Sequence, residues 1–367
     1  MSQIDFYIQF SLNLVEFKHY FEKFCLVALV DIHRGEELLS EIKEENFMKK
    51  SILFIGAATM IALVGCNKTK KADFTVGIAQ FAPHVALDAA TKGFKDQLTS
   101  LLEKQGKTVE YKETNAAGEI SNCPTIINDL VSKRVNLIMA NATPCVSAAY
   151  NATSNIPILG TSVTDYGVAL DLELNDGKTG TNVSGTSDLA PLDEQVNIMT
   201  SLVPSATKFG ILYSSSEANS KFQVKEVKAH LESKGLSVTE YAISGTDTLN
   251  AVCNTAAANE DCIYIPTDNF CADNANTIAP IFEGAHKPVF AGEAGICQKC
   301  GFATLSIDYY ELGKITGEMA YNVLVENVKI GELAIKYDSN PKKQYVKSRC
   351  ETLGITVTSD FEELAAE

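Results

Sequence analysis

Tryptophan is absent from the 367 residues, and only five residues are histidines. Basic residues are also few, because 31 lysines and arginines stand against 46 aspartates and glutamates, for a formal net charge of −15. Nucleic-acid-binding proteins need a basic surface that pairs with phosphates. The charge balance therefore argues against a nucleic-acid partner.

Common catalytic motifs are missing as well. The chain contains no nucleophile elbow, Walker loop, HExxH motif or dinucleotide-binding glycine fingerprint. After residue 67 the only histidines are His84, His230 and His286, which are too far apart in sequence to indicate a zinc site. We therefore expect a globular protein that is not an enzyme and that carries no metal and no cofactor.

A hydrophobic run long enough for a membrane helix is also lacking, since residues 52–64 fall short of the ~20 apolar residues required. This run follows the positive segment Met48-Lys49-Lys50 and ends in Leu63-Val64-Gly65-Cys66, which is the order of a secretory signal. The cysteine after a small residue resembles the bacterial lipobox, which implies lipidation of Cys66. We expect a signal peptide over residues 48–66, a polar tether over 67–72, and an extracytoplasmic protein that is lipid-anchored to the bacterial cell membrane.

Residues 1–47 precede this signal, although such a signal belongs at an N-terminus. We expect translation to start at Met48 and the upstream residues to be a mis-called extension. The alternative is a genuine cytoplasmic extension followed by an internal signal anchor.

Eight cysteines remain besides Cys25 and Cys66, an even number that is compatible with disulfides in an exported protein. Sequence alone does not give their pairing. Cys297-Gln-Lys-Cys300 permits a structural disulfide, two unreacted thiols or a redox motif. The flanking Gly295 and Gly301 predict a loop rather than the helix start that a redox motif needs.

From residue 73 onward, short apolar runs alternate with helical patterns. Residues 74–79 form one apolar run, and Leu87, Phe94 and Leu98 follow at the spacing of one helix face. Repeated units of this kind predict an α/β fold in which helices cover both faces of a parallel sheet.

Residues 135–160 and 262–292 repeat the same pattern of strand, polar turn, helix and a second short strand after X-Pro. The repeat predicts two doubly wound parallel-sheet lobes joined by a hinge, while a single elongated domain is the alternative. The expected lobes are residues 73–184 with about 304–337, and residues 185–303 with about 338–367.

The segments between strand ends and the following helices, here called elbows, are rich in hydroxyl and acidic side chains. Ligands bind at the carboxyl ends of strands in open α/β sheets. Helix N-termini with hydroxyl groups suit a carboxylate, whereas the acids at strand ends suit an ammonium group. Single elbow residues can also be helix N-caps. Together the elbows predict a zwitterionic ligand such as an amino acid, and the acids in question are Asp165, Asp188, Asp268 and Glu293.

Six elbow motifs, in order, resemble those of the ABC transporter substrate-binding lipoproteins, whose studied members take up aromatic amino acids. They are Asn141-Ala-Thr-Pro144, Gly185-Thr-Ser-Asp-Leu189, Leu212-Tyr-Ser-Ser-Ser-Glu-Ala-Asn-Ser220, Tyr264-Ile-Pro-Thr-Asp-Asn269, Val289-Phe-Ala-Gly-Glu293 and Ser306-Ile-Asp-Tyr-Tyr-Glu-Leu-Gly313. The resemblance covers about residues 73–360 and implies a type I periplasmic-binding-protein fold with the ligand between the lobes.

The resemblance also implies ligand-binding residues. Thr143 and Ser216 are expected to hold the α-carboxylate with backbone N–H groups near Asn219, while Asp268 and then Glu293 are expected to hold the ammonium group. Phe81 is a candidate ring contact, together with Tyr213 and Phe270. Many relatives have Glu-His-Pro where this chain has Pro83-His84-Val85. The full set of expected ligand-binding residues is Gln80, Phe81, Thr143, Asp165, Ser216, Glu217, Asn219, Thr267, Asp268 and Glu293.

We therefore predict a monomeric solute-binding lipoprotein of an ABC importer, with the permease and its ATPase as partners. Hinge closure on the solute would be non-catalytic. An extracytoplasmic sensing receptor and, further away, a thiol-disulfide oxidoreductase that uses Cys297 and Cys300 are the alternatives.

Overall fold

The structure is a computed structural model that describes residues 71–338 and 340–366. The expected extension (1–47), the signal peptide (48–66) with Cys66, and residues 67–70 of the tether lie outside the described residues. Within the described residues, no helix has both the length and the apolarity needed to span a bilayer.

Two sheets organise the compact unit from Ala72 onward. All pairings in the first sheet are parallel. From edge to edge, its strands are β11 (Lys336–Tyr337), β5 (Val183–Ser187), β4 (Ile158–Val163), β3 (Leu137–Asn141), β1 (Phe74–Gln80) and β2 (Val109–Asn115).

The second sheet is parallel except for its antiparallel β10–β12 pair. Its strands, in order, are β13 (Glu362–Leu364), β12 (Lys342–Val346), β10 (Ala303–Ser306), β9 (Val289–Ala291), β8 (Cys262–Ile265), β6 (Lys208–Ser214) and β7 (Ser237–Ile243). The predicted α/β class with two parallel-dominated sheets is confirmed.

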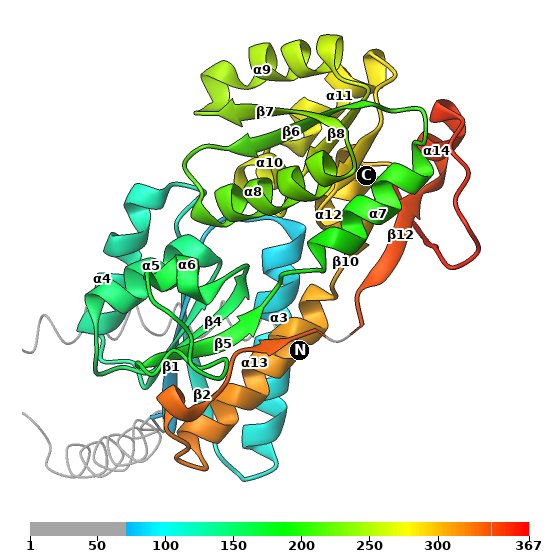
Figure 1. The fold of residues 1–367 in the computed structure, drawn as a ribbon. Coiled ribbons are helices and arrows are strands. Elements are labelled where there is room, and N and C mark those ends of the chain that lie inside the picture. The colour runs from blue at the N-terminus through cyan, green and yellow to red at the C-terminus, as the bar shows by residue number, and fades with distance from the viewer. Residues whose placement is uncertain (1–70, 339, 367) are drawn as a thin grey trace, which may run out of the picture. The chain divides into compact units, whose positions relative to one another are not determined.

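Helices connect these strands, as the sequence periodicity predicts (Figure 1). They are α3 (Val85–Glu103), η1 (Ile120–Asn122), α4 (Cys123–Ser132), α5 (Thr143–Ala152), α6 (Tyr166–Leu170), α7 (Leu192–Leu202), α8 (Ala218–Ser233), α9 (Thr246–Asn259), α10 (Asn269–Asp273), α11 (Ala275–Gly284), α12 (Ala294–Cys300), α13 (Tyr309–Leu324), η2 (Ile330–Glu332) and α14 (Lys347–Leu353).

The chain crosses between the sheets after β5, after β10 and after β11. Ala303–Ser306 pairs with β9 and β12 in the second sheet, so the second crossing follows Ser306 rather than residue 304. These crossings put segments from three distant parts of the sequence between the two sheets.

Helix α13 returns to the first sheet and lies along α3, as Figure 1 shows in orange and cyan. Glycine makes this approach possible. A Cβ atom on Gly93 would lie 2.0 Å from the carbonyl oxygen of Tyr310, and one on Gly313 would lie 2.0 Å from that of Ala90. Both glycines are therefore required by backbone proximity.

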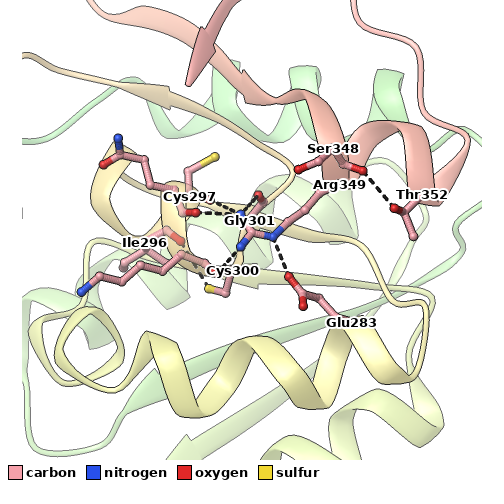
Figure 2. Close-up of polar contacts among 10 residues, drawn as sticks. Glu283, Ile296, Cys297, Cys300, Gly301, Ser348, Arg349 and Thr352 are labelled. Atoms are coloured by element: carbon pink, nitrogen blue, oxygen red, sulfur yellow. Dashed lines mark hydrogen bonds and ion pairs between the residues drawn. The ribbon is translucent and has the colours of Figure 1, made fainter. Parts of the chain in front are cut away.

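The loop expected around Cys297 and Cys300 is wrong, because both residues lie in helix α12. Groups distant in sequence stabilise the end of this helix. Figure 2 shows the Arg349 side chain pointing at the carboxyl end of α12, where its Nη1 atom donates to the carbonyl oxygen of Gln298 at 2.7 Å. Its Nε atom also donates to Glu283 at 2.8 Å. A cap supplied by α14 cannot be recognised from the local sequence.

Candidate ligand-binding site

Two buried hydroxyl groups at the carboxyl edge of the first sheet have no hydrogen-bond partner. Thr143 begins α5 and Ser162 lies near the end of β4, and the Oγ atoms of both are unpartnered. Asn141 and Thr161 are paired across β3 and β4, and the Ala142 backbone N–H donates to the carbonyl oxygen of Thr161 at 3.0 Å, so Thr143 and Ser162 follow the same end of neighbouring strands. Because buried polar atoms are normally hydrogen-bonded, these two hydroxyls are candidates for contact with a polar ligand.

The backbone at the same edge is strained. Ala142 has φ 84° and ψ 155°, a region that is essentially restricted to glycine. Ser162 has φ 53°, in the left-handed region. Strain of this kind persists where the fold enforces it, and here it orients the two residues that carry the unpartnered hydroxyls.

The second sheet contributes Asn219, in the first turn of α8. Its Nδ2 group donates to Glu217 at 3.0 Å and to the carbonyl oxygen of Thr267 at 3.1 Å. Its Oδ1 atom is buried and has no partner. Helix α8 begins at Ala218, so Asn219 is held at a helix start.

Glu217 is a buried acceptor for several donors. Its Oε2 atom accepts from the backbone N–H of Asn269 at 3.2 Å and from the side chains of Asn219 and Asn269. Its Oε1 atom accepts from the backbone N–H of Phe270 at 2.9 Å. Burial and the nearby Asp268 charge raise the pKa of Glu217 to about 7. The carboxyl group therefore positions the α8 and α10 elbows and has little capacity left for a ligand.

Asp268 has a similar structural role. Its Oδ1 atom accepts from the backbone N–H of Cys271 at 2.8 Å, as an N-cap of α10. Its Oδ2 atom accepts at 2.7 Å from both the Ser214 backbone N–H and the Ser220 hydroxyl. The carboxylate thus joins β6, α8 and α10.

Glu293 and Asp188 are less fully bonded. Glu293 caps α12 and accepts from the backbone N–H groups of Gly295 and Ile296. Asp188 accepts from the hydroxyls of Thr164 at 3.2 Å and Tyr309 at 3.0 Å. A carboxylate offers about four acceptor positions, so both retain capacity for a further donor.

The charge of Asp188 also affects the ionisation of Glu293. Burial raises the pKa of Glu293 to about 7, and the Asp188 charge contributes to that rise. Burial likewise raises the pKa of Asp188 to about 6. No lysine or arginine is buried among the described residues. A cationic group between the two acids would therefore be stabilised.

Two contacts join the edges of the sheets. His84, which precedes α3, lies 3.1 Å from Asn269 of α10 through Nε2 and Oδ1. Gln223 of α8 donates to Thr164 at 3.5 Å and to the carbonyl oxygen of Thr267 at 3.1 Å. The unpartnered atoms of the first sheet and Asn219 of the second thus lie on edges that face each other.

The remaining expected residues lie elsewhere or are half-buried. Gln80 faces α3, where it accepts from Thr91 at 2.7 Å and donates to Asp88 at 2.6 Å. Asp165 accepts from the Val168 backbone N–H as the N-cap of α6. Ser216 is exposed and bonds to Ser214 at 2.9 Å, while Thr267 accepts from α8.

The three residues expected to contact a ligand ring lie in different surroundings. Phe81 is 2% exposed and packs in the core beneath the first sheet. The hydroxyl of Tyr213 donates to Glu240 on β7, so the Tyr213 ring points toward β7 and not toward the facing edges. Phe270 is half-buried at the start of α10.

Sequence reasoning missed Ser162, His84, Asn269, Gln223 and Tyr309 as site residues. Ser162 lies three residues before Asp165, one of the acids expected at the site, so the sequence already pointed to this segment. Gln223 lies one turn inside a helix, where nothing in the local sequence distinguishes it from a solvent-facing residue.

The Cys297–Cys300 pair does not form a disulfide in the structure, and all eight described cysteines are free and buried. Burial raises the pKa of Cys300 to about 12 and raises that of Cys297 as well. Thiols held in the protonated form are poor nucleophiles, which argues against a redox motif here.

A sequence profile described as "ABC transporter substrate binding protein" matches residues 75–367. The chain belongs to this family of binding proteins. A tyrosine-binding protein of Clostridioides difficile (strain R20291) is 33% identical to this binding protein over an alignment of 301 positions, and the match covers 78% of this chain and 86% of the relative.

Two solved structures extend the comparison. The ABC domain from Streptococcus pneumoniae in complex with L-Trp is 30% identical and has a TM-score of 0.75, over 80% of this chain and 99% of that one. The ligand-free, open structure of a Clostridium difficile substrate-binding protein with adhesive properties is 31% identical and has a TM-score of 0.63, over 80% and 100%. The fold of this binding protein is therefore the type I periplasmic-binding-protein fold, as expected.

Proposed function

We propose that this protein is the extracytoplasmic solute-binding lipoprotein of an ABC importer and that it binds an aromatic amino acid between its two sheets. The observation that carries the proposal is the set of buried, unpartnered polar atoms on facing edges, namely those of Thr143, Ser162 and Asn219. The relatives named above bind tyrosine and L-Trp, which supports the ligand class.

The two ends of an amino acid would have different partners. The hydroxyls of Thr143 and Ser162, at the start of the ten-residue helix α5, suit the α-carboxylate. Glu293 and Asp188 suit the ammonium group for three reasons. Both are buried, the charge of Asp188 acts on Glu293, and both carboxyl groups keep free acceptor positions. Asp268, which the sequence favoured, is already occupied by three donors.

The arrangement of the sheets supports a closed form. At nearly equal identity, the protein is more similar to the L-Trp complex than to the open, ligand-free relative. A ligand shifts such an equilibrium only if it binds the closed form better than the open form. Contacts from both edges to one ligand would provide that difference.

Calorimetric titration of the purified protein tests the ligand class. The panel comprises L-tyrosine, L-phenylalanine and L-tryptophan, with L-leucine and the D-enantiomers as controls. We expect binding of at least one aromatic L-amino acid and at least tenfold weaker binding of its amide and N-acetyl derivatives. Failure of the whole panel to bind would contradict the proposal. Because the chain has no tryptophan, indole fluorescence of the purified complex would report bound tryptophan directly.

The lipid anchor and the importer are tested separately. Cells grown with a labelled fatty acid should incorporate the label into the parent protein and not into a Cys66→Ser variant. Co-purification with a permease and an ATPase from solubilised membranes would support the importer. A lone receptor kinase in their place would favour the sensing receptor.

A further inference from the structure

Cys123 and Cys145 form a buried thiol pair in the first half of the chain. Their Sγ atoms lie 3.9 Å apart, and both residues are essentially inaccessible to solvent. Cys123 is the first residue of α4 and Cys145 is the third residue of α5. The pair therefore joins the starts of two neighbouring helices.

The other thiols differ in their surroundings. Cys300 donates to the carbonyl oxygen of Ile296 at 3.3 Å and Cys350 to that of Phe302 at 3.4 Å. Within the described residues, Cys123 and Cys145 are the cysteines whose sulfur atoms are in hydrogen-bond contact with each other.

We propose that Cys123 and Cys145 are a disulfide-forming site, whose bond fastens the Thr143 elbow to α4 in an oxidising environment. The proposal goes beyond the proposed function, because formation of the bond requires no ligand. Disulfides persist outside the cytoplasm, which fits the proposed location.

The two sulfurs have different roles in the reaction. A hydrogen bond from Cys145 lowers the pKa of Cys123, whereas the same contact and burial raise the pKa of Cys145. The Cys123 thiolate attacks an organic disulfide such as oxidised glutathione, forms a mixed disulfide and releases one thiolate. Cys145 then loses its proton, attacks the Cys123 sulfur and releases the second thiolate. The protein loses two electrons and two protons, and the reagent is reduced to two thiols.

The residues directly before Cys123 form the solvent-facing turn η1. None of the residues of Ile120–Asn122 is buried, and Ile120 is 40% exposed. Local opening of this turn would bring the first residue of α4 to solvent without unfolding the sheet.

The bond would act on the elbow because Cys145 is two residues from Thr143. A disulfide requires the sulfurs to approach to about 2.0 Å, so the starts of α4 and α5 must draw together. Linking residues 22 positions apart restricts the unfolded chain. We expect the oxidised protein to melt higher than the reduced protein by on the order of 5 °C.

Peptide mapping of the full chain tests the site. The protein is incubated with oxidised glutathione or with dithiothreitol, quenched in acid and alkylated after unfolding. We expect one cross-linked peptide that contains Cys123 and Cys145, a mass loss of two hydrogens, and reversal by dithiothreitol. Persistence of both as alkylated thiols, or a glutathione adduct on Cys123 without the cross-link, would overturn the proposal.

Variants separate the pair from the other thiols. Cys123→Ser and Cys145→Ser should each abolish the cross-link and the oxidant-dependent rise in melting temperature. Cys350→Ser is the matched control, since a hydroxyl can still donate to Phe302, and it should retain both. If a pair variant fails to fold, the cross-link in the parent protein still decides the proposal. An unchanged melting temperature in a cross-linked parent would refute the fastening of the elbow.

Discussion

The Nε2 atom of His84 lies 3.1 Å from the Oδ1 atom of Asn269, and this contact joins elements of the two sheets. The Nδ2 group of Asn269 donates to Glu217, which leaves its Oδ1 atom as the acceptor. His84 therefore carries a proton on Nε2 and donates it to Asn269. Burial lowers the pKa of His84, although Asp88 and Asp273 act in the opposite direction.

Replacing His84 by alanine should weaken ligand binding more than it weakens the fold. A hydrogen bond between the sheets contributes about 1 kcal/mol to closure, so we expect roughly a fivefold loss in affinity. Calorimetry gives the affinity and thermal unfolding gives the stability. His230→Ala, on α8, is the control and should leave affinity unchanged. Equal affinity in His84→Ala and the parent would exclude a role for this contact in closure.

Stability of the ligand-free protein should depend on pH through its buried acids. The pKa values of Glu217 and Glu293 are raised to about 7 and that of Asp188 to about 6, all above their ordinary values. The folded state therefore binds more protons than the unfolded chain between about pH 4 and 7. Stability from these groups is highest below that window and falls as pH rises through it, while His84, with its lowered pKa, partly opposes the change.

An ammonium ligand should reverse this trend, because it stabilises the ionised acids. We expect the rise in melting temperature caused by the ligand to be larger at pH 8 than at pH 5.5. Thermal unfolding with and without ligand across this range measures both effects. A ligand effect that is independent of pH would contradict the role given to Asp188 and Glu293.

Removal of the unpartnered hydroxyl of Thr143 should change stability and ligand affinity in opposite directions. Thr143→Val removes a buried polar group without changing the shape of the side chain, so the ligand-free protein should gain up to about 1 kcal/mol in stability. Ligand affinity should fall about tenfold or more. Thr304→Val is the control, since the Thr304 hydroxyl is also buried and unpartnered but lies within β10. Thr304→Val should change stability alone. An equal loss of ligand affinity in both variants would contradict a specific ligand-binding role for Thr143.

The strained Ala142 offers a test of the elbow itself. Glycine accepts φ 84° without strain, so Ala142→Gly should stabilise the protein by about 1 kcal/mol after the entropy cost of glycine. Ala149→Gly, inside α5, should instead destabilise it by a similar amount. Urea unfolding of both variants measures the difference in stability. Destabilisation by Ala142→Gly would show that the Ala142 backbone is not strained.

The fold was predictable because its information is local. Leu87, Phe94 and Leu98 mark one buried face of α3, and the fully buried residues of β3 appear as a continuous apolar run. Helix α12 was not predictable, since Glu293 caps its start while Arg349, about fifty residues later, binds its end.

The site was predictable only as a set of elbows. Asp268 was correctly placed at a strand end, but its partners Ser214 and Ser220 are 54 and 48 residues away in sequence. Sequence alone does not tell a structural carboxylate from one that binds a ligand. That difference depends on how many acceptor positions the fold already occupies.

Paired amide substitutions test this distinction. Asp268→Asn keeps the size of the side chain but replaces an acceptor of three donors by a group that must also donate, so it should destabilise the protein by roughly 2–4 kcal/mol. In Glu293→Gln one of two backbone donors loses its acceptor, and both donors lie in the first turn of α12, so the change should cost less stability while ligand affinity falls tenfold or more. The reason is that Glu293 has two donors and a neighbouring acid, Asp188, whose charge a ligand ammonium group would offset. Urea unfolding and calorimetry on the same preparations compare the two effects. Loss of affinity in Asp268→Asn without loss of stability would restore Asp268 as the ammonium partner, because a carboxylate that holds β6, α8 and α10 together cannot be replaced without weakening the fold.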